Sequence, residues 1–215
     1  MGGDETYVEP NEKWWGGAIV DAKHAAGVFV RTLGAFQVIC DGTPVSGVVW
    51  QSKKARDLLK ILVARGRETS RELLIELLWP EVAPAKAGNR LSVLLWTLRN
   101  VLQPHARAGP LASNAGMVWL DRTHVNIDVE EFRTAATAAL DAHRCGQPDA
   151  TARLRAAAAA YTGDFLEEDA RQVWAIPLAE EVRATHIALL RALAAQLRQT
   201  GDIDEAIRCQ LRLLG

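Results

Sequence analysis

Between Pro84 and Pro104 the sequence places hydrogen-bonding side chains on one face of a predicted helix. Because a helix turns once every 3.6 residues or so, the leucines of this stretch share one stripe and the polar residues share the opposite face. That face holds no acid and consists of Lys86, Asn89, Arg90, Val93, Trp96, Thr97 and Asn100. Arginine suits the edge of guanine, asparagine that of adenine, and a small apolar group the methyl of thymine. The face therefore has the composition needed to read base pairs in the major groove of DNA.

Plain solvation is the alternative interpretation of this face. Solvated helix faces usually mix glutamate with lysine, whereas no acid occurs from Lys86 to Leu102, so we favour contact with DNA. Lys86 and Asn100 flank the face within reach of phosphates or bases. Trp96 stands at its edge, and we predict that it packs in the core beneath a neighbouring hairpin.

Other basic residues occur where DNA phosphates are expected. Phosphate contacts position a protein on DNA and supply most of its salt-dependent affinity. Two of these residues are lysines at the start of an earlier predicted helix, where the helix dipole disfavours positive charge, and this penalty favours a functional reason for them. The predicted phosphate contacts are Lys53, Lys54, Arg56 and Arg67.

The distribution of charge agrees with this interpretation. The net charge is −1, yet residues 28–127 hold 13 basic and 7 acidic side chains, and the segments on both sides are acidic. We interpret the basic middle segment as the part that faces a polyanion, with random scatter of surface charge as the alternative.

Short strands are predicted before the helices. Residues 28–33 and 36–40 have strand character, and Asp41-Gly42 is a hairpin signal that leads into a return strand at 43–45. Together they predict a small antiparallel sheet.

Two helices and a hairpin surround the helix between the prolines. Ser52 is a candidate cap for a helix that ends near Gly66, and Thr69 with Glu72 forms a capping box for the next helix. Residues 111–120 predict a β-hairpin, whose polar residues offer a weak minor-groove contact through Ser113, Asn114 and Gly116. The order of elements predicts a winged helix-turn-helix.

From Asp128 onward the pattern is helical throughout. Antiparallel helix pairs with small residues at their crossings predict a tetratricopeptide-like α-helical domain over residues 128–215. Such repeats stack on neighbours, so we expect a fragment of a longer protein, with a capping end as the alternative. The predicted fold class is mainly α with small β, divided into an N-terminal extension (1–27), a DNA-binding domain (28–127) and this helical domain.

Motifs for catalysis are missing from the sequence. It has no phosphate loop, dinucleotide fingerprint, nucleophile elbow or zinc-protease motif, and its five histidines lack metal-ligand spacing. We expect no enzyme activity, no cofactor and no metal. We interpret the three cysteines as buried thiols and the run Asp164–Asp169 as a solvated acidic loop. Without a membrane-spanning stretch or a signal peptide, a cytoplasmic, nucleoid-associated protein is expected.

A set of ordered motifs resembles one family. The segments "LGAFQV", "DGTPV", "SKKARDLLKILV", "LIELLWP", "NRLSVLLWTLRNVL", "VNIDVEEF" and "YTGDFL" are similar to those of the Streptomyces antibiotic regulatory proteins. These proteins join an OmpR-type winged helix to a bacterial transcriptional activator domain. The resemblance extends from about Val28 to Gly215.

The resemblance implies a transcriptional activator that regulates secondary metabolism or a related pathway. It implies binding of double-stranded DNA at promoter direct repeats as a side-by-side homodimer, and contact with RNA polymerase through the loop Glu81, Val82 and Ala83. Recognition is carried over to Lys86, Asn89, Arg90, Val93, Thr97 and Asn100. From the residues alone, the alternative is a signalling or scaffold module that does not bind DNA and whose helical repeats bind a protein or small ligand.

Overall fold

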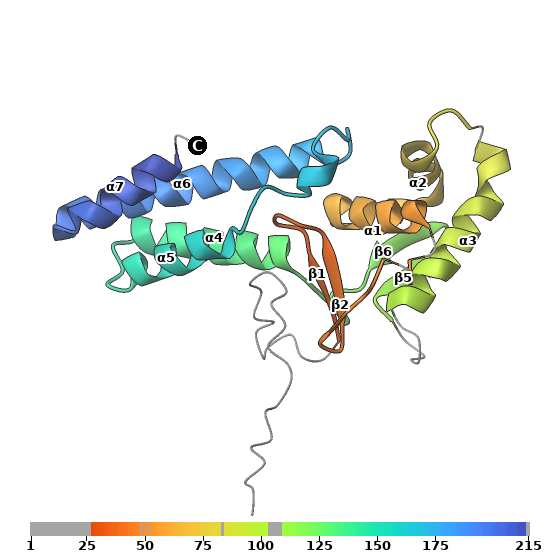
Figure 1. Cartoon of the computed structure of the whole chain (residues 1–215), viewed down its shortest axis with the longest axis horizontal. Coiled ribbons are helices and arrows are strands. Elements are labelled where there is room, and N and C mark those ends of the chain that lie inside the picture. The colour runs from red at the N-terminus through yellow and green to blue at the C-terminus, as the bar shows by residue number, and fades with distance from the viewer. Residues whose placement is uncertain (1–26, 48, 51, 83, 103–108, 214–215) are drawn as a thin grey trace, which may run out of the picture.

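The protein is mostly helical, with short strands near the middle of the molecule (Figure 1). The computed structural model describes residues 27–47, 49–50, 52–82, 84–102 and 109–213, so the predicted extension 1–27 lies almost wholly outside the described residues. The strands are β1 (Val28–Arg31), β2 (Gln37–Cys40), β3 (Thr43–Pro44), β4 (Thr69–Ser70), β5 (Leu111–Asn114), β6 (Met117–Leu120) and β7 (Val125–Ile127). The helices are α1 (Lys53–Arg65), α2 (Arg71–Leu78), α3 (Pro84–Leu102), α4 (Asp128–Arg144), α5 (Ala150–Ala160), the short 3-10 helix η2 (Glu167–Asp169), α6 (Ile176–Thr200) and α7 (Ile203–Arg212).

The strands form two small sheets. In the first, the order is β3-β2-β1-β7, and β1 pairs antiparallel with β2 but parallel with β7. In the second, the order is β4-β6-β5, with β5 and β6 forming the predicted hairpin. The turn at Asp41-Gly42 is also confirmed, since it joins β2 to β3. The sequence pattern did not predict strands β4 and β7, which are only two and three residues long.

The helices before residue 103 follow the predicted boundaries, but their caps differ. The second helix is capped by Ser70, whose hydroxyl accepts a hydrogen bond from the Leu73 amide at 3.2 Å. The predicted capping box at Thr69 is therefore wrong, because Thr69 is a buried strand residue whose hydroxyl donates to the Arg67 carbonyl. Ser52 precedes α1 as predicted, but its side chain makes no capping hydrogen bond.

After β7 the described chain is helical, and α4 to α7 form one layer that extends to the side of the sheets (Figure 1). We call α4–α7 the helical layer. Small residues allow close packing there: Ala157 and Ala158 of α5 are buried, as are Ala136 and Ala139 of α4. Among the described residues, no helix is both long and apolar enough to cross a membrane.

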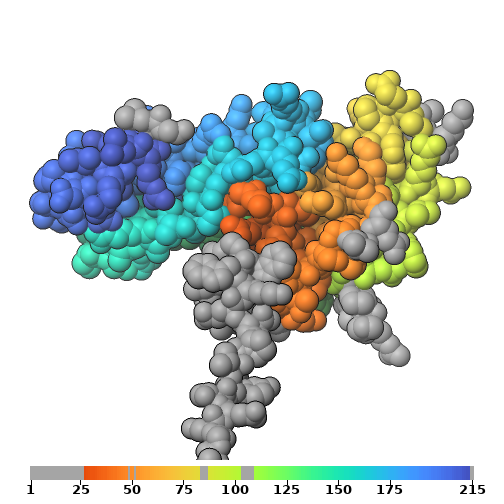
Figure 2. All heavy atoms as spheres, in the orientation of Figure 1, coloured from red at the N-terminus to blue at the C-terminus, as the bar shows by residue number. Residues whose placement is uncertain are grey.

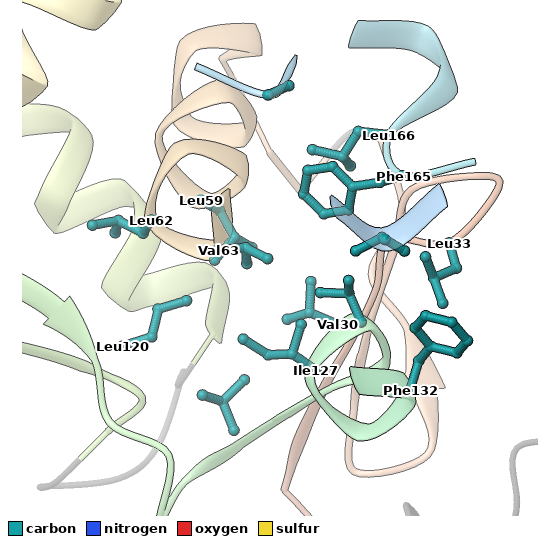
Figure 3. Close-up of a cluster of buried hydrophobic side chains, with 14 of the residues drawn as sticks. Val30, Leu33, Leu59, Leu62, Val63, Leu120, Ile127, Phe132, Phe165 and Leu166 are labelled. Atoms are coloured by element: carbon teal, nitrogen blue, oxygen red, sulfur yellow. The ribbon is translucent and has the colours of Figure 1, made fainter. Parts of the chain in front are cut away.

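One hydrophobic core connects the sheets and the helical layer. Figure 3 shows Val30 of β1 and Ile127 of β7 between Val63 of α1 and Phe132 of α4. Phe165, from the segment after α5, closes the same cluster and is 1% exposed. The helical layer and the N-terminal elements therefore share buried side chains.

Hydrogen bonds reinforce this junction. The Asp128 carboxylate accepts from the Thr32 amide and the Leu33 amide at 2.8 Å, from the Thr32 hydroxyl at 2.6 Å, and from the Val129 amide at 2.7 Å. The Gly34 amide donates to the Asp164 carbonyl at 2.9 Å. The loop after β1 is thus bonded both to the start of α4 and to the segment after α5.

An ion pair crosses the same junction. Lys60 of α1 is 4% exposed, and its ammonium is bonded to the carboxylate of Asp169 in η2. The same ammonium lies 4.8 Å from the centre of the Phe36 ring. The acidic run at Asp164–Asp169 is therefore not the simple solvated loop that the sequence predicted, because Asp169 pairs with Lys60 of α1 and Asp164 pairs with Arg183 of α6.

We expect Gly163→Ala to destabilise the junction. A Cβ at Gly163 would lie 2.8 Å from the Cα and 3.1 Å from the amide nitrogen of Gly34, and backbone atoms cannot move aside as a side chain can. Overpacking of this kind costs about 1–3 kcal/mol of unfolding free energy, measurable by urea unfolding. Gly47→Ala is the matched control, since Gly47 lies outside the helices and a Cβ there meets nothing within 4 Å. Equal stability of the Gly163→Ala variant and the wild type would contradict the close approach.

Candidate nucleic-acid interface

Helix α3 lies at the end of the molecule opposite to α7, and one of its sides points away from the other labelled elements (Figure 1). In the space-filling view its residues reach the outer edge of the molecule (Figure 2). Its buried side holds Leu91, Leu95 and Leu98, each at most 2% exposed. We call the solvent-exposed set on the other side the outer face of α3, which consists of Asn89, Arg90, Val93, Trp96 and Asn100.

Two predicted positions on this helix differ from expectation. Trp96 is 62% exposed, so the prediction that it packs in the core beneath the hairpin is wrong. Thr97 is only 9% exposed, and its hydroxyl donates to the Val93 carbonyl one turn earlier, at 3.0 Å. Both differences have one cause: the buried side of α3 is wider than the leucines alone indicated. It includes Thr97 and excludes Trp96.

Hydrogen bonds from two arginines hold α3 against its neighbours. Arg71, the first residue of α2, donates to the Ser92 hydroxyl at 2.8 Å and to the Gly88 carbonyl at 3.5 Å. Arg99 of α3 donates to the hydroxyl of Ser113 in β5 at 3.0 Å. Sequence reasoning missed both bonds, because each arginine looks like an ordinary surface charge until the fold brings its serine partner close. They fix α3 relative to α2 and to the hairpin.

The hairpin β5–β6 stands beside α3 with its turn exposed. Ser113 is exposed, and its hydroxyl accepts the hydrogen bond from Arg99. Asn114 and Gly116 are exposed at the turn itself. Gly116 has φ +80°, a backbone conformation that side chains rarely adopt, and its carbonyl accepts from the Arg71 amide at 3.0 Å. The three predicted hairpin residues are thus together at one end of the hairpin, next to the N-terminus of α2.

Two of the predicted phosphate contacts at α1, Lys54 and Arg56, have partners within the protein. Lys54 donates to the Leu78 carbonyl at 2.9 Å and lies 3.8 Å from the Asp57 carboxylate. The Arg56 guanidinium lies 5.5 Å from the centre of the Phe36 ring. Lys53 and Arg67 are exposed. Of the four predicted phosphate contacts, Lys53 and Arg67 are therefore the most accessible to an external phosphate.

Lys53 also borders a hollow between α1 and the helical layer. Its volume is about 180 Å³, and Trp174 and Gln172 line it from the segment before α6. Leu78, at the end of α2, closes another side. The exposed lysine is therefore near the junction of the two parts of the molecule.

The connection from α2 to α3 is short. Glu81 is exposed and Val82 is partly buried against the core. Ala83, the third residue predicted to face polymerase, lies outside the described residues, and so does the side chain of Lys86.

The chemistry available on these surfaces is hydrogen bonding and apolar contact. Within the described part of the chain, no group of three or more histidine, cysteine or acidic side chains could hold a metal ion. The three cysteines are free; Cys209 is buried and Cys40 half-buried, but Cys145 is exposed, so the prediction that all three are buried is wrong. A helix with an exposed, acid-free face is suited to bind a ligand with anionic and hydrogen-bonding groups.

Parts of this chain are similar to a protein family and to a solved structure. Residues 127–215 match the family model of the bacterial transcriptional activator domain. A solved structure, "Mycobacterium tuberculosis EmbR in complex with low affinity phosphopeptide", is 25% identical, with a TM-score of 0.63. The match covers 79% of this chain and 48% of that chain, so this chain spans about half the length of EmbR. No curated protein sequence matches significantly.

The family model covers α4 to α7 and begins at the last residue of β7. The structural likeness extends over most of the chain. Residues 127–215 are therefore similar to the bacterial transcriptional activator domain.

Proposed function

We propose that this protein is a transcriptional activator that binds specific sequences of double-stranded DNA. In this proposal α2 and α3 form a helix-turn-helix, α3 is the recognition helix, and β5–β6 is the wing of an OmpR-type winged helix. The helical layer is a tetratricopeptide-like activator domain. The proposal keeps the division into residues 28–127 for DNA and 128–215 for activation.

The observation that carries the proposal is the outer face of α3. Asn89 and Arg90 are exposed there and have the side chains that pair best with adenine and guanine edges. The helix contains no acidic residue to repel phosphates. Arg71 and Arg99 hold the helix through Ser92 and Ser113, so the face is presented on a fixed support.

The other predicted roles follow from position. Lys53 and Arg67 are exposed and suited to phosphates, and Asn114 and Gly116 of the wing are placed to approach a minor groove. Glu81 is exposed on the α2–α3 connection, where the proposal assigns the contact with RNA polymerase. Two chains side by side on direct repeats complete the proposal.

Selection of bound duplexes from random DNA tests the proposal directly. Enrichment of one sequence, repeated at a fixed spacing, is the expected result, because it reports both recognition and pairing of two chains. Binding of the selected duplex should fall steeply with rising salt, since each neutralised phosphate releases counterions. Failure to enrich any sequence at low salt would contradict the proposal.

Lys53→Ala should weaken binding to all duplexes by the same factor. The exposed ammonium contributes to phosphate contact without reading a base, so its loss should lower the slope of log affinity against log salt by about one. Filter binding to the selected duplex and to a random duplex, over a range of salt, measures both slopes. Arg208→Ala on α7 is the control, because this exposed charge lies in the helical layer. A loss confined to the selected duplex would rule out a phosphate role.

The rival function is a scaffold whose helical layer binds a protein. One observation favours it: Ile203, Ile207 and Leu211 of α7 are 50%, 48% and 61% exposed and share one helix face. A gel-shift assay with fragmented genomic DNA separates the two functions. No retention of any fragment at low salt would favour the scaffold.

A further inference from the structure

One stripe of α3 faces away from the core more directly than any other. Asn89, Val93, Trp96 and Asn100 follow one another at intervals of four, three and four residues, which keeps them on one side of a helix. All four are exposed, and Leu91 and Leu98 lie on the opposite side at 0% exposure. Trp96 is therefore near the middle of the surface that α3 offers to a ligand, and not at its edge.

Val93 and Trp96 form an apolar pair within this stripe. They are 61% and 62% exposed and are separated by three residues, so their side chains are neighbours on the helix surface. Asn89 precedes the pair and Asn100 follows it. An apolar pair at the centre of a helix face, with hydrogen-bonding groups at both ends, is complementary to a ligand that presents an apolar group between polar ones.

The charges around the pair identify the class of ligand. Helix α3 has no acidic residue in its first turn and carries arginine at positions 90 and 99. Arg71 of α2 adds a further positive charge beside Ser92. A protein surface does not require a rim of one sign, whereas a polyanion does. Among the groups that DNA presents in its major groove, the apolar one is the C5 methyl of thymine.

We propose that Trp96, together with Val93, reads thymine methyl groups in the major groove, an inference that rests on the DNA-binding function proposed above. The indole covers the methyl of one thymine, and Val93 that of a neighbouring base. The contact determines specificity, because cytosine and both purines lack this methyl group. It assigns a role to an exposed tryptophan of the recognition helix that hydrogen bonding to bases leaves unused.

Removal of single methyl groups tests the contact. Each thymine of a duplex selected by the wild-type chain is replaced in turn by deoxyuridine, which pairs like thymine but lacks the methyl. We expect affinity to fall about fourfold at one or two positions, equivalent to about 0.8 kcal/mol for one buried methyl. Trp96→Ala should bind the unmodified duplex more weakly and should lose the difference between thymine and deoxyuridine at one of these positions. Val93→Ala should lose it at the neighbouring one.

The outcomes separate this inference from the function on which it rests. Leu211→Ala on α7 is the matched control, since Leu211 is 61% exposed and should keep the wild-type response. If deoxyuridine has no effect at any thymine, or if Trp96→Ala keeps the wild-type ratio, the methyl contact is overturned while selection of a specific duplex still supports DNA recognition. If no duplex is selected, the proposed function fails as well. Thermal unfolding of each variant shows that the chain has folded.

Discussion

Replacement of Arg90 by alanine is expected to lower affinity for the selected duplex by about 5- to 150-fold, the equivalent of roughly 1–3 kcal/mol for a guanine contact. Arg90 is exposed on the outer face of α3, and a guanidinium can donate two hydrogen bonds to the O6 and N7 of guanine. Affinity for random DNA should change far less. Fluorescence anisotropy with both duplexes measures the ratio of the two affinities.

The base at which Arg90 acts can be identified in the same experiment. The variant should tolerate substitution of one guanine that the wild-type chain requires, because the bidentate contact is gone. Arg153→Ala is the control: Arg153 is exposed on α5, and its ion pair with Asp149 is on the surface of the helical layer. Equal losses on selected and random DNA would show that Arg90 contacts phosphate and reads no base.

Asp128→Ala is expected to reduce the free energy of unfolding by about 2–4 kcal/mol. The carboxylate satisfies the amides of Thr32 and Leu33, and Thr32 is fully buried. A buried donor that loses its acceptor costs about 1–3 kcal/mol. In this variant more than one donor loses its acceptor, because the Thr32 amide, the Thr32 hydroxyl and the Leu33 amide all donate to Asp128. Urea unfolding followed by circular dichroism measures the change.

Two further variants serve as comparisons for the loss of stability in Asp128→Ala. Thr32→Val removes only the hydroxyl that donates to Asp128 and should cost less, about 1 kcal/mol. Asp149→Ala removes a carboxylate whose ion pair with Arg153 is exposed, and should be close to neutral. If Asp128→Ala is no more harmful than Asp149→Ala, the bonds to the loop after β1 do not stabilise the junction.

The local pattern of the sequence was sufficient to predict the helices. The stretch between Pro84 and Pro104 forms α3, because its leucine periodicity and its prolines set both the buried side and the ends. The hairpin at 111–120 also follows from local turn chemistry, with β5 and β6 joined at Ala115 and Gly116. These features depend on neighbours in the sequence.

Long-range pairing was not predictable from such patterns. Parallel pairing of β7 with β1 joins Val28 to Val125, nearly a hundred residues apart, and the strand has only three residues. The pairing of Lys60 with Asp169 is equally remote, and a lysine in an otherwise apolar helix gave no sign of its partner. Such contacts depend on how elements are brought together, which residue periodicity does not encode.

The candidate site was predicted only in part, because some of its features also depend on how the elements pack together. The acid-free face of α3 is visible in the sequence, and Asn89 and Arg90 are exposed as a recognition role requires. Trp96 was misplaced because tryptophan is usually counted as a core residue, and Thr97 because threonine is usually counted as polar. The width of the buried stripe depends on what packs against the helix, which becomes known only from the fold.

Because Ile127 ends β7 and Asp128 begins α4, the helical layer is joined to the sheet without a hinge segment. In mechanical terms it is a lever clamped at its base by Asp128 and by the ion pair of Lys60. Helix α6 has 25 residues and is therefore about 37 Å long. A tilt of roughly 10° at the clamp moves the far end of such a helix by about 6 Å. A load applied near α7 is thus carried to the sheet that contains β7 and, through Lys60, to α1, which packs against α3.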